Sequence, residues 1–437
     1  MALSIIIPQI NFLINTYFIG NYKPSNTVFT TQDLLAASGI AGVYYLTLMM
    51  IIQGLCSGLL MLVSRKAGQN DWSGLFFTFV HGVVVALVLS LLFVLFSFLS
   101  ADFLIHHIIE NKLIVDTANP FIQLRILGLP FLSCILLINT YLLAISKPKY
   151  IVIISIVQTL SNILLDYIFI FGHAGASEMG LQGAALASVF SEGIACIVAF
   201  FIFFFLYKNN NQIDFKKVRF QVFEFLYVFK KSLPLMGQNF LSVGAWFIFF
   251  ILVEKIGKAE AAVSQILRSV FGVVGLANWA LSSTTNTMVS NLLGQNRYNE
   301  IIPLVHKLVK ISLFSALLLG IPILFNIDTF LHILTHDEAL IAVGKNPMRV
   351  VILAVFVLSI STIYFNAVIG TGATKNNLLF ELCAIVLYLI YILIQVFVMH
   401  CNLTTIWMSE YVYWVTLLGL STWYLYSKKW YKNTSAI

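Results

Sequence analysis

Residues 161–172 read SNILLDYIFIFG, an apolar run with one carboxylate, Asp166, in its middle. With the residues before it, this run forms a window of about 20 apolar residues, the length that an α-helix needs to cross a bilayer. The composition of the whole chain agrees. Hydrophobic residues make up 60% of the 437 residues and charged residues only 10%, whereas soluble domains average about 25% charged residues. The sequence therefore predicts a protein built in lipid.

Apolar windows of this length recur along the whole chain. They number about twelve by the length criterion and lie near 2–20, 35–63, 75–100, 120–145, 150–172, 181–207, 233–256, 261–290, 304–326, 347–370, 376–399 and 405–427. Little chain remains for a soluble domain. We therefore predict an all-α polytopic membrane protein with about twelve transmembrane helices.

Basic residues gather in alternate loops of this predicted topology. The longest basic stretch is 208–231, whereas acidic residues dominate the loops on the opposite side, 101–118 and 327–344. Lys and Arg are enriched in cytoplasmic loops, so we expect 208–231 and both termini in the cytoplasm. The net charge of +7 is then a topology signal. We expect a lipid bilayer, and no nucleic acid, as a partner.

A repeated motif divides the chain into halves. MLVSRKAGQN at 61–70 and TMVSNLLGQN at 287–296 match at a constant offset in Val63/Val289, Ser64/Ser290, Gly68/Gly294, Gln69/Gln295 and Asn70/Asn296. We expect an N-terminal six-helix lobe over 1–207, a connecting loop over 208–231, and a C-terminal six-helix lobe with a short basic tail over 232–437. An even number of helices per half predicts a pseudo-two-fold axis along the membrane normal, as in secondary transporters.

Several motifs resemble the multidrug and toxic compound extrusion (MATE) family. They include INTYFIG at 14–20, LLAASGIAGVYY at 34–45 and VSNLLGQNR at 289–297. The most specific is SNILLDYIFIFG followed by MGLQGAALAS, ending at residue 188. The resemblance implies a V-shaped pair of six-helix bundles in a bacterial inner membrane. Such proteins export organic, often cationic, drugs or metabolites in exchange for H⁺ or Na⁺.

The resemblance also implies an ion site in the N-terminal lobe. In many relatives it consists of an Asp on helix 1, an Asn and an Asp on helix 5, and a Thr on helix 6. Asn162 and Asp166 match the helix 5 pair, Ser188 falls where the Thr is expected, and Asn15 stands at the helix 1 position in place of Asp. The acids that some relatives carry on helices 7 and 10 are missing. We therefore expect coupling in the N-terminal lobe, with Na⁺, if it is the ion, at Asp166 and Asn162.

The spacing of polar residues indicates the same helices independently. Residues four apart share a helix face, which groups Gln158, Asn162 and Asp166 on one helix and Ser188 with Glu192 on the next. A charge at the bilayer centre costs about 2.5–3.5 kcal/mol even on lenient scales, so Asp166 should face a bundle interior or a watery cavity. We therefore expect Glu192 to take part in ion coupling together with Asp166, Asn162, Asn15 and Ser188. The alternatives are a neutral, hydrogen-bonded acid at Asp166 and a purely structural Glu192.

The sequence is compatible with three functions. The first is a cation-coupled exporter, with Gln158, Arg268 and Gln238 as cavity candidates. The second is a flippase for lipid-linked sugars or another amphipathic lipid, which should place several basic residues in its cavity, whereas only Arg268 is a strong candidate. The third is a membrane enzyme, which would need a constellation of His, Asp or Ser near one membrane face. We predict the exporter, acting as a monomer on small organic molecules, with no catalytic residues and no cofactor.

Overall fold

The computed structural model describes residues 14–15, 17–20, 22, 31–108, 112–208, 219–335 and 337–433. Every regular element in these ranges is helical. Ten of the described helices are long and apolar enough to cross a membrane, so the predicted all-α polytopic membrane protein is confirmed. Most of the first expected window, 2–20, lies outside the described residues.

The helices group into two compact units. The first comprises residues 1–63 and 71–230, and the second comprises residues 64–70 and 231–437. The second unit begins at the end of the expected connecting loop. It also includes residues 64–70, which contain the last turn of helix α2 (Thr31–Gly68). Helix α8 (Val222–Glu254) passes from the first unit into the second.

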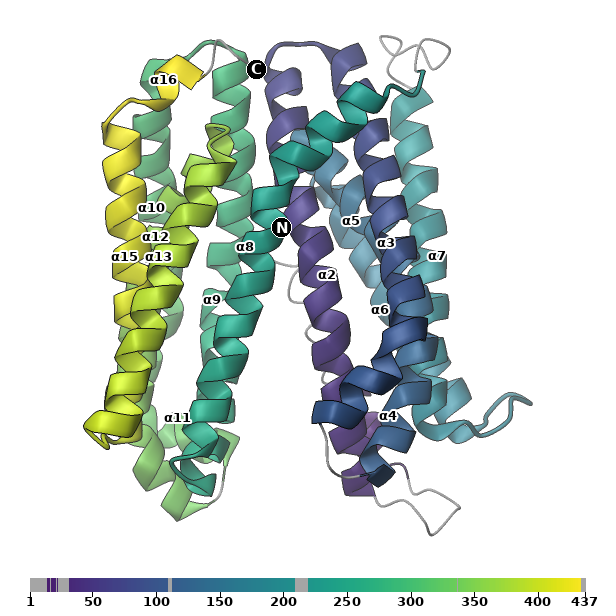
Figure 1. The fold of residues 1–437 in the computed structure, drawn as a ribbon, viewed down its shortest axis with the longest axis vertical. Helices are drawn as coiled ribbons and strands as arrows, with labels where there is room; N and C mark the ends of the chain where they lie inside the picture. Colours follow the sequence, from purple (N-terminus) through teal and green to yellow (C-terminus); the bar gives the residue numbers. More distant parts are fainter. Residues whose placement is uncertain are drawn as a thin grey trace. The chain divides into compact units, whose positions relative to one another are not determined.

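The first unit is organised around helix α7. Its other elements are α2 (Thr31–Gly68), α3 (Trp72–Ile108), α4 (Lys112–Arg125), η1 (Ile126–Gly128), α5 (Leu129–Ala144) and α6 (Lys149–Phe171). α7 (Gly180–Lys208) packs against α4, α5 and α6, and α3 packs against α4 and α5 (Figure 1). Large apolar side chains such as Leu91, Leu95 and Leu99 on α3 are exposed, as suits a surface in contact with lipid tails.

The fourth transmembrane segment is broken and starts earlier than expected. We predicted an outer loop over 101–118, but α3 continues to Ile108 and α4 already begins at Lys112. The 3₁₀ turn η1 then separates α4 from α5, which has a proline in its first turn. Proline is favoured at this position because its missing N–H has no partner in a first turn. The break places the end of α4, Arg125, inside the bundle.

The second unit is organised around α12 (Glu338–Gly370). It also contains α9 (Lys258–Gly294), η3 (Tyr298–Glu300), α10 (Ile301–Phe325), α11 (Ile327–Leu334), α13 (Thr374–Leu393), the π-helical turn η4 (Ile394–Val398), α14 (Leu403–Trp407), α15 (Ser409–Tyr426) and α16 (Trp430–Asn433). α12 lies against α9, α10 and α15, and α13 lies against α15 (Figure 1). The expected outer loop over 327–344 is instead largely helical, because α11 and the first turns of α12 occupy it.

The last residue of the repeated motif has the same backbone conformation in both copies. Asn70 and Asn296 both adopt a left-handed conformation, with φ of 56° and 60°. Both sites belong to the second unit, where the ends of α2 and α9 meet. A Cβ on Gly68 would overlap the Asn291 carbonyl, and a Cβ on Gly294 would overlap the Arg65 carbonyl. The recurring glycine therefore allows two helix backbones to touch.

Candidate functional site

A polar stripe on α6 is buried in the first unit. Ser155, Thr159, Asn162 and Asp166 are all buried. The opposite face of α6 exposes Leu160, Leu164 and Tyr167. The helix therefore turns its polar side inward and its apolar side outward, as a membrane environment requires. Gln158, which we grouped with this stripe, is only half-buried, whereas Ser155 and Thr159 were missed.

Asp166 is the most isolated member of the stripe. Its side chain is fully buried, and neither carboxylate oxygen has a hydrogen-bond partner among the described residues. The positive charge of Arg125 acts on it electrostatically, but no ion pair joins Asp166 to a base in the described part of the chain. An ionised carboxylate without compensating contacts is costly to bury. Asp166 therefore suits the binding of a proton or a small cation.

The segment that bears Asn15 packs against the helix that bears Asp166. Ile19, four residues after Asn15, and Ile170, four residues after Asp166, are buried in the same apolar cluster. The side-chain oxygen of Asn15 is buried and has no hydrogen-bond partner among the described residues. Neither side chain forms a hydrogen bond with the other among the described residues, so their common place in an ion site stays a prediction. The side-chain oxygens of Asn15 and Asp166 are of the kind that can bind Na⁺.

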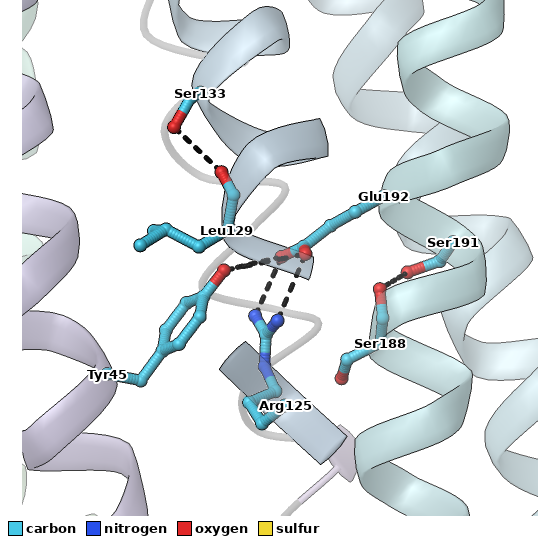
Figure 2. Close-up of polar contacts among 7 residues, drawn as sticks. All are labelled: Tyr45, Arg125, Leu129, Ser133, Ser188, Ser191 and Glu192. Atoms are coloured by element: carbon cyan, nitrogen blue, oxygen red, sulfur yellow. Dashed lines mark hydrogen bonds and ion pairs between the residues drawn. The ribbon is translucent and has the colours of Figure 1, made fainter. Parts of the chain in front are cut away.

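Glu192 on α7 is paired with a base, unlike Asp166. Arg125 donates from Nη1 to Glu192 Oε2 over 3.0 Å and from Nη2 to Oε1 over 2.7 Å. Tyr45 on α2 donates to the same carboxylate at 3.3 and 3.4 Å, and the guanidinium lies 3.7 Å from the centre of its ring. Figure 2 shows the three side chains meeting from three helices. These contacts hold the Glu192 carboxylate between three helices, and its expected part in ion coupling stays a prediction.

Ser188 stands one turn before Glu192 on α7. It is half-buried, and its carbonyl oxygen accepts a hydrogen bond of 2.8 Å from the Ser191 hydroxyl (Figure 2). Within the described part of the chain, the Ser188 side chain forms no hydrogen bond with the carboxylate of Asp166. Its expected place in the ion site is therefore still a prediction.

Gly128 makes room for the Arg125 and Glu192 pair. A Cβ at this position would overlap Glu192 Oε2 and approach Arg125 Nη1 to 2.8 Å. The glycine forms the end of η1, between the two halves of the broken segment. The break in the helix and the ion pair are therefore parts of one arrangement.

The cavity candidates of the second unit have separate surroundings. Gln238 on α8 is buried, and its Oε1 accepts a hydrogen bond of 2.7 Å from Asn377 Nδ2 on α13. Arg268 on α9 is exposed, and its guanidinium lies 5.4 Å from the centre of the Phe250 ring. The structure therefore does not join these two residues in one contact.

Two buried carboxylates of the second unit were missed. Glu381 on α13 is 1% exposed, and its Oε1 accepts hydrogen bonds from the Ser242 hydroxyl and, over 2.5 Å, from the Tyr413 hydroxyl. Glu410 on α15 is 2% exposed and accepts a hydrogen bond of 2.9 Å from Trp414 Nε1. Glu381 lies within an apolar window, so the criterion that selected Asp166 would have found it. Within the described residues, no group of three His, Cys, Asp or Glu side chains could hold a metal ion.

Comparison with known proteins places this architecture in a family. The MatE family profile matches residues 1–168 and 234–394. The chain is 21% identical to the probable multidrug resistance protein NorM of Thermotoga maritima, over 82% of this chain and 75% of that protein. It is 20% identical to the multidrug resistance protein NorM of Photobacterium profundum, over 76% of this chain and 70% of that protein.

Solved structures share the fold at low sequence identity. A crystal structure of a MATE protein in the straight conformation superposes with a TM-score of 0.85 at 15% identity, covering 100% of this chain and 94% of that one. A mutant of the Vibrio cholerae MATE transporter VcmN superposes with a TM-score of 0.85 at 16% identity, covering 100% of this chain and 95% of that one. The fold and motifs define a polytopic membrane transporter of two helical lobes. The chain belongs to the MatE family, and the predicted family is thereby confirmed.

Proposed function

We propose that this protein is a secondary antiporter that exports organic, often cationic, drugs or metabolites in exchange for H⁺ or Na⁺. The names of the NorM relatives, which are multidrug resistance proteins, support the export of such compounds. The basic loops support a location in a bacterial inner membrane with both termini in the cytoplasm.

The observation that carries the proposal is the isolation of Asp166. Its carboxylate is fully buried and has no hydrogen-bond partner among the described residues. Asn162 is buried one turn away on the same helix face. A buried carboxylate in these surroundings is best stabilised when it binds H⁺ or Na⁺. Release of the ion on one side of the membrane and its recapture on the other would couple the ion gradient to export.

Efflux from proteoliposomes under separately imposed H⁺ and Na⁺ gradients tests this function. Asp166→Asn keeps the size of the side chain and its hydrogen-bonding capacity but removes the charge. We expect gradient-driven export by this variant to fall to the background of empty liposomes. Folding and insertion should persist, because removing the charge lowers the cost of burial. The gradient that drives export by the wild type identifies the coupling ion.

Asp116→Asn is a matched control, because Asp116 is exposed near the start of α4. The same chemical change at this site should leave export unchanged. Wild-type rates and unchanged H⁺ and Na⁺ dependence in Asp166→Asn would show that the carboxylate is structural and that the coupling proposal is wrong. Glu192→Gln tests the second acid. We expect it to affect folding rather than coupling, because Glu192 is paired with Arg125.

A further inference from the structure

Glu381 lies where α8, α13 and α15 meet in the second unit. It is 1% exposed. Ser242 reaches it from α8, 139 residues earlier in the chain, and Tyr413 reaches it from α15. Asn377, one turn before Glu381 on α13, donates to Gln238 on α8. The carboxyl group therefore belongs to a small polar cluster that joins three helices.

Glu381 has no basic partner in the part of the chain that the structure describes. Among the described residues, no Lys, Arg or His forms an ion pair with it, in contrast to the pairing of Glu192 with Arg125. The titratable groups around the cluster are Tyr413, Tyr388, whose ring packs on Tyr413, and Glu410, whose charge acts on Tyr413. None of the three supplies a positive charge. An ionised Glu381 would therefore be a buried charge stabilised by hydroxyl groups alone.

The number of hydrogen atoms available in the cluster indicates whether Glu381 is protonated or ionised. The Ser242 hydroxyl contacts two acceptors, the Gln238 carbonyl oxygen at 3.0 Å and Glu381 Oε1. A serine hydroxyl has one hydrogen and can also accept. Both contacts of the Ser242 hydroxyl are hydrogen bonds if Ser242 donates to the Gln238 carbonyl and accepts a hydrogen from a protonated Glu381. Tyr413 then donates to the second lone pair of Oε1.

We propose that Glu381 is a proton-binding site of the second unit. With the proton bound, a chain of hydrogen bonds runs from Tyr413 through Glu381 and Ser242 to the Gln238 carbonyl. On release, the O–H bond of Glu381 breaks and the proton passes to water at the partly exposed Ser242 side of the cluster. The Ser242 hydroxyl then turns from the Gln238 carbonyl to the carboxylate. The exchange moves hydrogens without requiring a large movement of heavy atoms.

A proton fits this cluster better than a metal ion. The Tyr413 hydroxyl and Glu381 Oε1 are 2.5 Å apart, and Ser242 is also in direct contact with Oε1. Such contacts are those of hydrogen-bonded oxygens, with no room for a cation between them. The inference does not depend on the proposed role of Asp166, because the two carboxyl groups belong to different units.

Infrared spectroscopy of the full chain in lipid tests the site directly. A protonated carboxyl group has a C=O stretching band well separated from the bands of ionised carboxylates. We expect the wild type at neutral pH to show a band of this kind that is lost in Glu381→Gln. In Ser242→Ala, the band should remain and shift to higher frequency, because the carboxyl group loses its acceptor. Glu300→Gln, which changes an exposed acid, should leave the carboxyl C=O region of the spectrum unchanged.

Three results would overturn the proposal. The first is an unchanged carboxyl region in Glu381→Gln, which would mean that Glu381 is ionised. The second is loss of the Glu381 band on adding Na⁺ at constant pH, which would indicate a cation site. The third is an unchanged band position in Ser242→Ala, and this variant decides the question even if Glu381→Gln does not fold. Loss of export in Asp166→Asn is a separate measurement, so the two proposals can fail independently.

Discussion

Glu192 in the first unit and Glu381 in the second are both buried glutamates on long apolar helices, but their surroundings differ. Glu192 has two hydrogen bonds from one guanidinium. Glu381 has hydroxyl partners and no base among the described residues. A buried charge with a well-placed counter-charge can stay ionised, whereas one without it is stabilised by binding a proton. Burial alone therefore does not reveal what a membrane carboxylate does, and the partner decides it.

Arg125→Gln should show the largest effect and test the first half of this comparison. It leaves Glu192 buried without its counter-charge, and breaking a buried pair costs about 3–5 kcal/mol. The free energy of unfolding in mixed micelles should fall by that amount. Arg297→Gln is a matched control, because Arg297 forms an exposed pair with Glu300 and exposed pairs contribute little. Equal effects of the two changes would contradict the structural role of the buried pair.

Gly128→Ala should have the next largest effect. The added methyl group would overlap Glu192 Oε2, which its two bonds to Arg125 hold in place. Overpacking of this kind costs about 1–3 kcal/mol, and the same denaturant titration measures it. Gly193→Ala on α7 is the control, since a Cβ there has nothing within 4 Å. A tolerated Gly128→Ala would mean that the ion pair can shift.

Tyr45→Phe separates the hydroxyl of Tyr45 from its ring. The ring would still stack on the Arg125 guanidinium, while the long hydrogen bond that the hydroxyl shares between the two Glu192 oxygens is lost. We expect a loss of about 0.5–1.5 kcal/mol in unfolding free energy. A loss as large as that of Arg125→Gln would show that the hydroxyl, and not the guanidinium, holds the carboxylate.

Glu381→Gln should have the smallest effect on stability. A protonated acid makes both contacts at Oε1, whereas an amide nitrogen placed there can donate to Ser242 but cannot accept from Tyr413. Only one hydrogen bond between neutral groups is then lost, so the loss should stay at or below about 1 kcal/mol. The loss of unfolding free energy should therefore differ most between Glu381→Gln and Arg125→Gln, although both changes affect the site of a buried glutamate. A loss of several kcal/mol for Glu381→Gln would indicate an ionised carboxylate in the wild type.

Much of the fold could be predicted from the sequence, because apolar windows and basic loops are local properties of the chain. The segments 101–118 and 327–344, expected as outer loops, are largely helical because helices continue beyond the apolar windows that mark the lipid core. Their expected place outside the cell stays a prediction. The buried face of α6 was predicted from residues four apart, and Asn162 and Asp166 do lie on it. Glu381 was missed although it lies within an apolar window, because the family resemblance points to acids on helices 7 and 10 instead.

The sequence by itself determined the membrane class, the repeat and the helix that bears an isolated carboxylate. These follow from composition and from the helical period, which relates residues within one helix. Only the tertiary structure decided that Glu192 meets Arg125, 67 residues away, and that Glu381 meets Ser242, 139 residues away. Such contacts depend on how each helix is rotated about its axis against its neighbours. That rotation results from the packing of many side chains, so no single stretch of sequence contains it.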